Sequence, residues 1–120
     1  MHALVVDDDP LILECCRRVL GAQGFRLVEA SSVDEALSCL QKDRFDLLLT
    51  DAKMPDKDGL FLVEMARTRW PEMRVLVMSG YTTPETVSSS RTAGASFLSK
   101  PFGPDELLDA IHGVLQGGIP

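Results

Sequence analysis

The chain alternates five times between short apolar runs and segments with helical periodicity. The strand-like runs fall near residues 3–6, 25–29, 45–50, 74–78 and 95–99. Each run is followed by residues with helical spacing, which is the pattern of repeated strand–helix units. The third run carries consecutive leucines, which suits a strand that is buried on both faces of a parallel sheet. The alternation therefore predicts an α/β fold built on a parallel sheet.

Several helix ends can be located from the sequence. Asp9 followed by Pro10 suits the start of the first helix, with aspartate as the N-cap and proline in the first turn. Gly21 and Gly24 are predicted to stop this helix. The fourth helix, between residues 84 and 94, has few apolar residues and a run of serines. Serine is a mediocre helix former, so we expect this helix to be easily displaced.

Length and composition limit the classes of function. A chain of 120 residues is expected to form one domain over residues 1–120, and the glycine-containing end at 117–120 reads as the start of a linker or tail. The net charge of −6 disfavours direct binding to nucleic acid or to an anionic membrane. No apolar stretch approaches the roughly 20 residues that cross a bilayer, and no signal peptide precedes the first strand.

The three cysteines lack the spacing of a zinc site, and their odd number argues against a disulfide framework. Cys15, Cys16 and Cys39 are therefore interpreted as reduced, partly buried thiols. Reduced thiols are typical of a cytoplasmic protein.

Polar residues stand at the carboxyl ends of four predicted strands. They are Asp7 and Asp8, Asp51, Ser79 and Lys100. The carboxyl ends of parallel strands meet at one edge of the sheet, where such folds bind ligands. Three carboxylates gathered there require a cation, whereas a hydroxyl and an ammonium group suit an anion such as phosphate. A site that combines a divalent metal with a phosphoryl group indicates phosphoryl transfer.

Four segments that contain these residues resemble the receiver domain of two-component response regulators, in a chemotaxis-regulator-like form. They are residues 5–10, 51–59, 78–80 and 99–102, and they read VVDDDP, DAKMPDKDG, MSG and SKPF. The match extends from the first strand to the last helix. It implies a flavodoxin-like, doubly wound (βα)5 fold in three layers, with the parallel strands in the order 2-1-3-4-5.

The resemblance also implies roles for the acidic residues. Asp51 would be the phosphoacceptor that takes a phosphoryl group from a phosphohistidine. Asp8 and Asp51 would hold Mg²⁺, or Mn²⁺, together with the backbone carbonyl of Lys53, while Asp7 would act mostly through a bound water. Asp9 is interpreted as the helix cap described above and not as a metal ligand.

Further residues are placed in the switch by the resemblance. Lys100 would contact a phosphoryl oxygen, and the bond between Lys100 and Pro101 would be cis. Ser79 would turn its hydroxyl toward the phosphoryl group. Phe97 would follow by rotating inward and would reshape the surface of helix four, strand five and helix five. The alternative for Phe97 is an ordinary half-buried aromatic residue on an edge strand.

Lys53 and Tyr81 occupy two positions that tune the lifetime of the phosphorylated state in this family. Lys53 lies two residues after the acceptor and Tyr81 two residues after Ser79. A lysine that pairs with nearby oxygens and a tyrosine that covers the site both point toward slow hydrolysis. The alternative is that both are plain surface residues.

The expected function is phosphorelay signalling, with a histidine kinase or a histidine phosphotransfer protein as the partner. The domain would catalyse transfer to itself and its own slow dephosphorylation, so it is not a conventional enzyme with a free substrate. The resemblance also allows an output domain or effector protein, and a homodimer that forms on phosphorylation. One alternative is a degenerate receiver that binds proteins without phosphorylation. Another is an aspartyl-phosphate phosphatase, which Lys53 disfavours because that class commonly carries a second aspartate there.

Overall fold

The computed structural model describes residues 1–54, 56, 58–80 and 95–117. The strands are β1 (His2–Val6), β2 (Arg26–Ala30), β3 (Leu47–Asp51), β4 (Arg74–Ser79) and β5 (Ser96–Ser99). The helices are α1 (Pro10–Ala22), α2 (Val33–Lys42), α3 (Gly59–Arg69) and α5 (Pro104–Gly117). The helix that the sequence predicts between residues 84 and 94 lies outside the described residues, and so does Tyr81.

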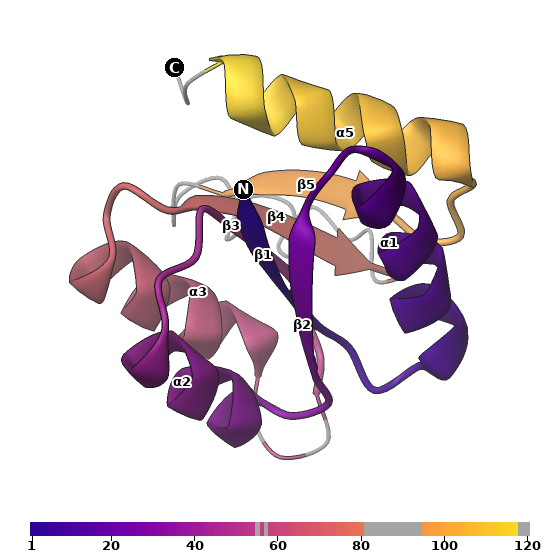
Figure 1. The fold of residues 1–120 in the computed structure, drawn as a ribbon. Helices are drawn as coiled ribbons and strands as arrows, with labels where there is room; N and C mark the ends of the chain where they lie inside the picture. The colour runs from indigo at the N-terminus through magenta and orange to yellow at the C-terminus, as the bar shows by residue number, and fades with distance from the viewer. Residues whose placement is uncertain (55, 57, 81–94, 118–120) are drawn as a thin grey trace.

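All five strands are parallel and follow the order β2-β1-β3-β4-β5. Helices α1 and α5 cover one face of the sheet, and α2 and α3 cover the other (Figure 1). This arrangement confirms the predicted doubly wound, three-layer fold. It also brings the carboxyl ends of β1, β3, β4 and β5 to the same edge of the sheet.

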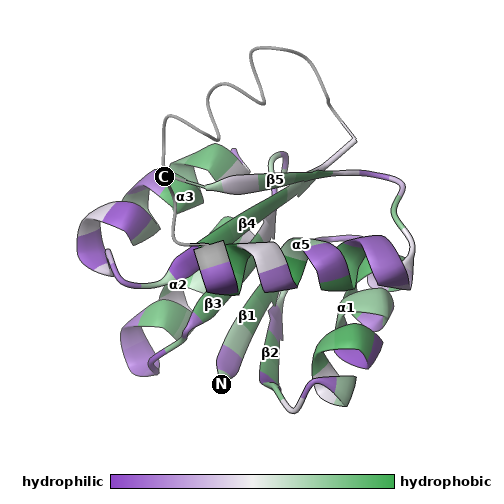
Figure 2. Ribbon diagram, turned by 90° about the horizontal axis from the view of Figure 1, so that it is seen from above, coloured by the Kyte–Doolittle hydropathy of each residue, from purple (hydrophilic) through white to green (hydrophobic). Residues whose placement is uncertain are grey.

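Two apolar layers, one on each face of the sheet, form the core. All five residues of β3 are buried, as its position at the centre of the sheet and its leucines require. Leu48 belongs to the cluster that includes Val33 of α2 and Val63 of α3, whereas Leu49 belongs to the cluster with Ile111 of α5. In Figure 2 the strands are mostly green, with purple residues along the outer sides of the helices. Because neighbouring side chains of β3 point to opposite faces of the sheet, this one strand packs against both helical layers.

Helix α1 begins as the sequence predicts and ends later than expected. The Asp9 side chain caps it by accepting a hydrogen bond from Leu11 N. Gly21 lies inside the helix, so the prediction that it stops the helix is wrong. The chain turns at Gly24, whose φ is +84°, and the amide of Gly24 donates to the carbonyl of Gly21 while that of Phe25 donates to Leu20. This is a Schellman motif, in which a glycine in the left-handed region follows the cap.

The cysteines are free thiols: Cys16 is buried, and Cys15 and Cys39 are half-buried. Across the described ranges, none of the helices combines the length and the apolar character that a bilayer-spanning helix needs.

Candidate functional site

The carboxyl edge of the sheet brings together residues from four strands. Asp7 directly follows β1, Asp51 is the last residue of β3, and Ser79 is the last residue of β4. Lys100 follows β5, and its amide donates a hydrogen bond of 2.8 Å to the carbonyl oxygen of Ser79. The sequence predicted this convergence. The hydrogen bond from Lys100 to Ser79 connects the residue after β5 to the end of β4.

The ammonium group of Lys100 links the two buried carboxylates of the site. Its Nζ lies 2.7 Å from Asp7 Oδ2 and 3.1 Å from Asp51 Oδ2. The other oxygen of each carboxylate accepts a backbone hydrogen bond. Asp7 Oδ1 accepts from Asp9 N at 2.9 Å, and Asp51 Oδ1 accepts from Lys53 N at 3.2 Å. Both carboxylates are therefore held in a fixed orientation, with Lys100 as the shared cation.

Burial governs the electrostatics of this pair. Asp7 is fully buried, and Asp51 is 9% exposed. Burial raises the pKa of Asp7, and this effect exceeds the lowering by the Lys100 and Asp9 hydrogen bonds. For Lys100, burial alone would lower the pKa, but contacts with Asp7 and Asp51 outweigh it and raise the pKa. Lys100 is therefore a cation at neutral pH, and the ionised form of Asp7 is held at a cost in stability.

Asp8 completes a group of three carboxylates. One oxygen each of Asp7, Asp8 and Asp51 lies within 4.8 Å of the others, and Asp8 is exposed. A donor set made only of carboxylate oxygens suits a hard divalent cation such as Mg²⁺. An exposed member leaves a side open for water ligands, which Mg²⁺ retains. The residues present therefore fit the cation that the sequence predicts.

Backbone contacts connect the two ends of the loop from β3 to α3. Lys53 and Asp58 form an antiparallel β-bridge, and the amide of Gly59 donates to the carbonyl of Ala52 at 2.9 Å. The Asp58 side chain caps α3 by accepting from Leu60 N. These contacts hold the backbone of Lys53 beside the carboxylate of Asp51.

Asp56 is a residue of this loop that the sequence reasoning missed. Its carboxylate accepts hydrogen bonds from Val33 N at 3.1 Å and from Asp34 N at 3.2 Å, at the start of α2. An acidic residue in a loop suits a helix N-terminus in general. No local pattern in the sequence links position 56 to a helix that begins 23 residues earlier.

Of the remaining predicted residues, Tyr81 lies outside the described part of the chain. Ser79 is fully buried, and Phe97 is half-buried on β5, where it packs against the cluster shared with α2 and α3. The bond between Lys100 and Pro101 is cis. Lys53 is exposed, and Asp9 is the helix cap and not part of the carboxylate group.

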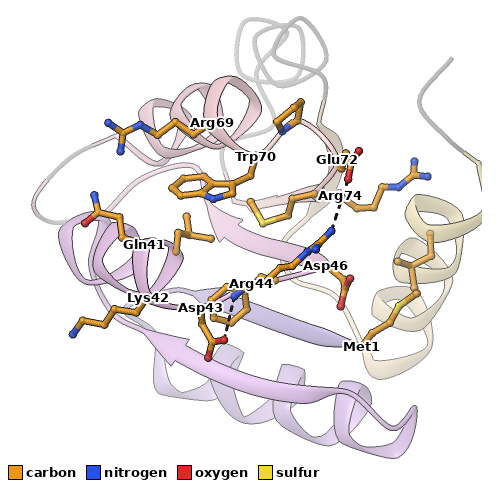
Figure 3. Close-up of a pocket in the computed structure, with 15 residues that line it drawn as sticks. Met1, Gln41, Lys42, Asp43, Arg44, Asp46, Arg69, Trp70, Glu72 and Arg74 are labelled. Carbon is orange, nitrogen blue, oxygen red and sulfur yellow. Dashed lines mark hydrogen bonds and ion pairs between the residues drawn. The ribbon is translucent and has the colours of Figure 1, made fainter.

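A pocket lies at the opposite, amino edge of the sheet (Figure 3). Asp46, just before β3, and Arg74, the first residue of β4, line it, together with Trp70 after α3. Across it Arg44 and Glu72 form an exposed ion pair at 3.9 Å. Because Asp51 stands at the other end of β3, this pocket is separate from the carboxylate site.

The comparisons with known proteins agree with the geometry. A family model described as the response regulator receiver domain matches residues 3–112. The chain is 32% identical over 120 residues to the transcriptional regulatory protein GlrR of Escherichia coli, covering 99% of this chain and 27% of that protein. A CheY-like response regulator receiver domain protein from Methanospirillum hungatei has a TM-score of 0.87 at 34% identity, over 92% of this chain and 90% of that one.

A second solved structure is of a response regulator protein from Burkholderia pseudomallei with a phosphorylated aspartic acid, a calcium ion and citrate. It has a TM-score of 0.85 at 27% identity, and the match covers 97% of this chain and 66% of that one. The chain spans only part of the length of the curated relatives it matches, such as 27% of GlrR and 53% of the response regulator MprA of Mycobacterium leprae. The match to the family model nevertheless extends over nearly all of this chain. The chain therefore belongs to the receiver domains of two-component response regulators, which take part in phosphorelay signalling.

Proposed function

We propose that Asp51 accepts a phosphoryl group from a phosphohistidine on a histidine kinase or a histidine phosphotransfer protein. The observation that carries the proposal is the contact of Lys100 Nζ with the carboxylates of both Asp51 and Asp7. It places a nucleophilic oxygen, a cation and a second carboxylate at one open edge of the sheet. This edge, and not the pocket beside Trp70, is where a donor would dock.

The transfer follows from the chemistry of the carboxylate. An oxygen of Asp51 attacks the phosphorus, the phosphorus–nitrogen bond breaks, and its electron pair returns to the imidazole ring of the donor. The product on this chain is an acyl phosphate. Lys53 N and Lys100 Nζ each hold one oxygen of Asp51, so the nucleophile is oriented before the donor arrives. Lys100 then serves as a compact positive charge for a phosphoryl oxygen.

Asp7, Asp8 and Asp51, with the backbone carbonyl of Lys53, would hold the Mg²⁺ or Mn²⁺ on which the reaction depends. When bound, the cation neutralises charge on the transferring phosphoryl oxygens. The close grouping of the three carboxylates supports this assignment. The calcium ion and phosphorylated aspartic acid named for the Burkholderia protein support it further.

The phosphorylated state would act through the surface of helix four, β5 and α5. Ser79 would contribute its hydroxyl to the phosphoryl group, and Phe97 would rotate inward behind it. Ser79 ends β4 and pairs with Ser99 of β5, so the edge that receives the phosphoryl group is joined directly to that surface. Hydrogen exchange should then change on β5 and α5 when Asp51 is phosphorylated, and changes confined to α1 and α2 would contradict this output surface.

Lys53 and Tyr81 would set the lifetime of the acyl phosphate. The exposed Lys53 side chain belongs to the residue whose amide holds Asp51 Oδ1, so we expect it to lie near the path of an attacking water. Replacing Lys53 with alanine should shorten the lifetime if its side chain shields the phosphoryl group.

The wider setting is also part of the proposal. Residues 1–120 would form one receiver domain in the cytoplasm, with residues 117–120 starting a linker toward an output domain or effector protein. The net charge of −6 supports a protein partner over direct binding to nucleic acid or a membrane. Pairing of two phosphorylated copies is a further interaction of the output surface.

Intact-mass spectrometry with acetyl phosphate tests the central claim. The wild type should gain one phosphate only when Mg²⁺ is present, and Asp51→Asn should gain none. Asp109→Asn, which removes an exposed carboxylate from α5, serves as the control and should be labelled like the wild type. Equal labelling of Asp51→Asn, or labelling in excess EDTA, would remove the proposal.

A further inference from the structure

The first turn of α2 receives its hydrogen-bond acceptors from two different parts of the chain. Ser32, the N-cap, accepts from Glu35 N through its side chain at 3.1 Å. The amides of Val33 and Asp34 instead donate to the two carboxylate oxygens of Asp56. Helix termini expose several unpaired amides, so a carboxylate there is favoured both as an acceptor and as a charge at the positive end of the helix.

Asp56 joins this helix to the loop that carries Lys53. Within the loop, Lys53 N donates a hydrogen bond to Asp51 Oδ1, and the backbone of Lys53 forms a β-bridge with the backbone of Asp58. The loop is thus tied to the end of β3 at one point and to the start of α2 at another.

We propose that Asp56 is a positioning residue for the cation site: by anchoring the loop to α2, it fixes the backbone of Lys53 for both Asp51 and the metal. This inference rests on the proposed function, in which the Lys53 carbonyl is a ligand. A loop without the anchor samples more orientations, and binding the cation then has to order it. The lost conformational freedom reduces the affinity for the metal.

The side chain at position 56 offers a graded series. Asp56→Asn keeps the shape and one acceptor oxygen but loses the charge that favours the helix N-terminus. Asp56→Ala loses both hydrogen bonds. The anchor therefore predicts that affinity for Mg²⁺ falls in the order wild type, Asp56→Asn, Asp56→Ala.

Two control variants separate anchoring from other effects at the same place. Ser32→Ala removes the other cap of α2 and weakens the helix start, but it removes neither of the two amides that donate to Asp56. Asp34→Asn removes a negative charge at the same helix terminus, while the backbone amide of residue 34 still donates to Asp56. If loss of the anchor is the cause, neither control should change Mg²⁺ affinity as Asp56→Ala does.

Calorimetric titration with MgCl₂ on the folded proteins measures the effect directly. We expect Asp56→Ala to bind Mg²⁺ about tenfold more weakly, the lower end of the effect of losing groups that orient metal ligands. Ser32→Ala should lower the urea midpoint, followed by Trp70 fluorescence, and leave the Mg²⁺ dissociation constant unchanged. The affinity of Asp56→Asn should lie between those of the wild type and Asp56→Ala.

Each other result has a definite meaning. Asp56→Ala with wild-type Mg²⁺ affinity would show that Asp56 is only a helix cap, and the proposed function would stand. An equal loss in Asp34→Asn would assign the effect to charge and overturn the anchor. A wild type that binds no Mg²⁺ would overturn the proposed function as well. If Asp56→Ala does not fold, Asp56→Asn against Asp34→Asn decides between the same outcomes.

Discussion

Gly59 leaves no room for a side chain beside the backbone carbonyl oxygen of Asp51. A Cβ atom at position 59 would collide with this oxygen and lie 3.1 Å from the carbonyl carbon of Ala52. The first residue of α3 is therefore packed directly against the strand end that carries the proposed phosphoacceptor. The Cβ would be fixed to the backbone of residue 59, and the oxygen belongs to the backbone of Asp51. Neither atom can therefore move away by a side-chain rotation.

Gly59→Ala should be clearly destabilising. We expect the free energy of unfolding to fall by about 1–3 kcal/mol, the usual scale for overpacking a closely packed site. The displaced loop should also slow phosphorylation by acetyl phosphate. Urea unfolding can be followed by the fluorescence of Trp70, the single tryptophan, which is half-buried against the core. Gly113→Ala is the matched control, because a Cβ in that α5 position meets no atom within 4 Å. It should gain roughly 0.5–1 kcal/mol.

Asp7→Asn should stabilise the protein in metal-free buffer at neutral pH, because an amide of the same shape avoids the cost of burying an ionised carboxylate. Burial raises the pKa of Asp7 in the folded state. The stability linked to its protonation is therefore present below the ordinary aspartate pKa and is lost as pH rises through the raised value. Asp7→Asn should not lose this stability as pH rises. The difference in free energy of unfolding between the variant and the wild type should therefore grow with pH across that window. Melting in EDTA at several pH values measures it, with the exposed Asp109→Asn as control. A wild type more stable than Asp7→Asn at neutral pH would contradict the sign.

Lys100→Met should bind Mg²⁺ more tightly while accepting phosphate more slowly. The ammonium lies 2.7 Å from Asp7 and 3.1 Å from Asp51, so it competes with the cation for the same two carboxylates. Removing it should raise affinity about fivefold, which corresponds to roughly 1 kcal/mol of charge repulsion. Calorimetric titration measures the affinity, and intact-mass kinetics measure the labelling. Lys42→Met, at an exposed position in the last turn of α2, should change neither. Weaker Mg²⁺ binding by Lys100→Met would show that the lysine supports the metal site.

Cys16 should resist thiol reagents in the native state. Burial raises the pKa of its thiol to about 12, from an ordinary value of 9.0. At pH 8 a disulfide reagent should therefore modify the half-buried Cys15 and Cys39 before Cys16. The raised pKa means that the folded state favours the neutral thiol. The stability that this preference contributes is present below pH 9 and is lost as pH rises toward 12. The stability difference between wild type and Cys16→Ala should shrink over that range, and a constant difference would contradict the assignment.

The sequence sufficed for the described part of the fold because its strands are marked by composition and its helices by the spacing of apolar residues. β3 is the clearest case, since its consecutive leucines match complete burial between two helical layers. The convergence of Asp51, Ser79 and Lys100 followed from parallel topology alone. Gly21 was misplaced because a glycine near a helix end is compatible with both the last turn and the cap. Only the +84° φ of Gly24 distinguishes the two positions.

Details within the site depended on contacts that no local pattern contains. Asp7 and Asp8 are adjacent and chemically identical, yet Asp7 is buried beside Lys100 and Asp8 is exposed. Which of them turns inward depends on where the pleat of β1 ends. The role of Asp56 depends on the distance between a loop and a helix from different parts of the chain. Sequence spacing does not determine such distances.

The bond between Lys100 and Asp7 joins residues that are 93 positions apart in the chain. Lys100 is in place only when β5 has paired with β4, because its own amide is held by Ser79 at the end of β4. A chain in which the last strand has not yet docked has the acceptor on β3 but not the ammonium beside it. The proposed site is therefore complete only when the whole sheet has formed, and a partly unfolded copy lacks the cation beside Asp51.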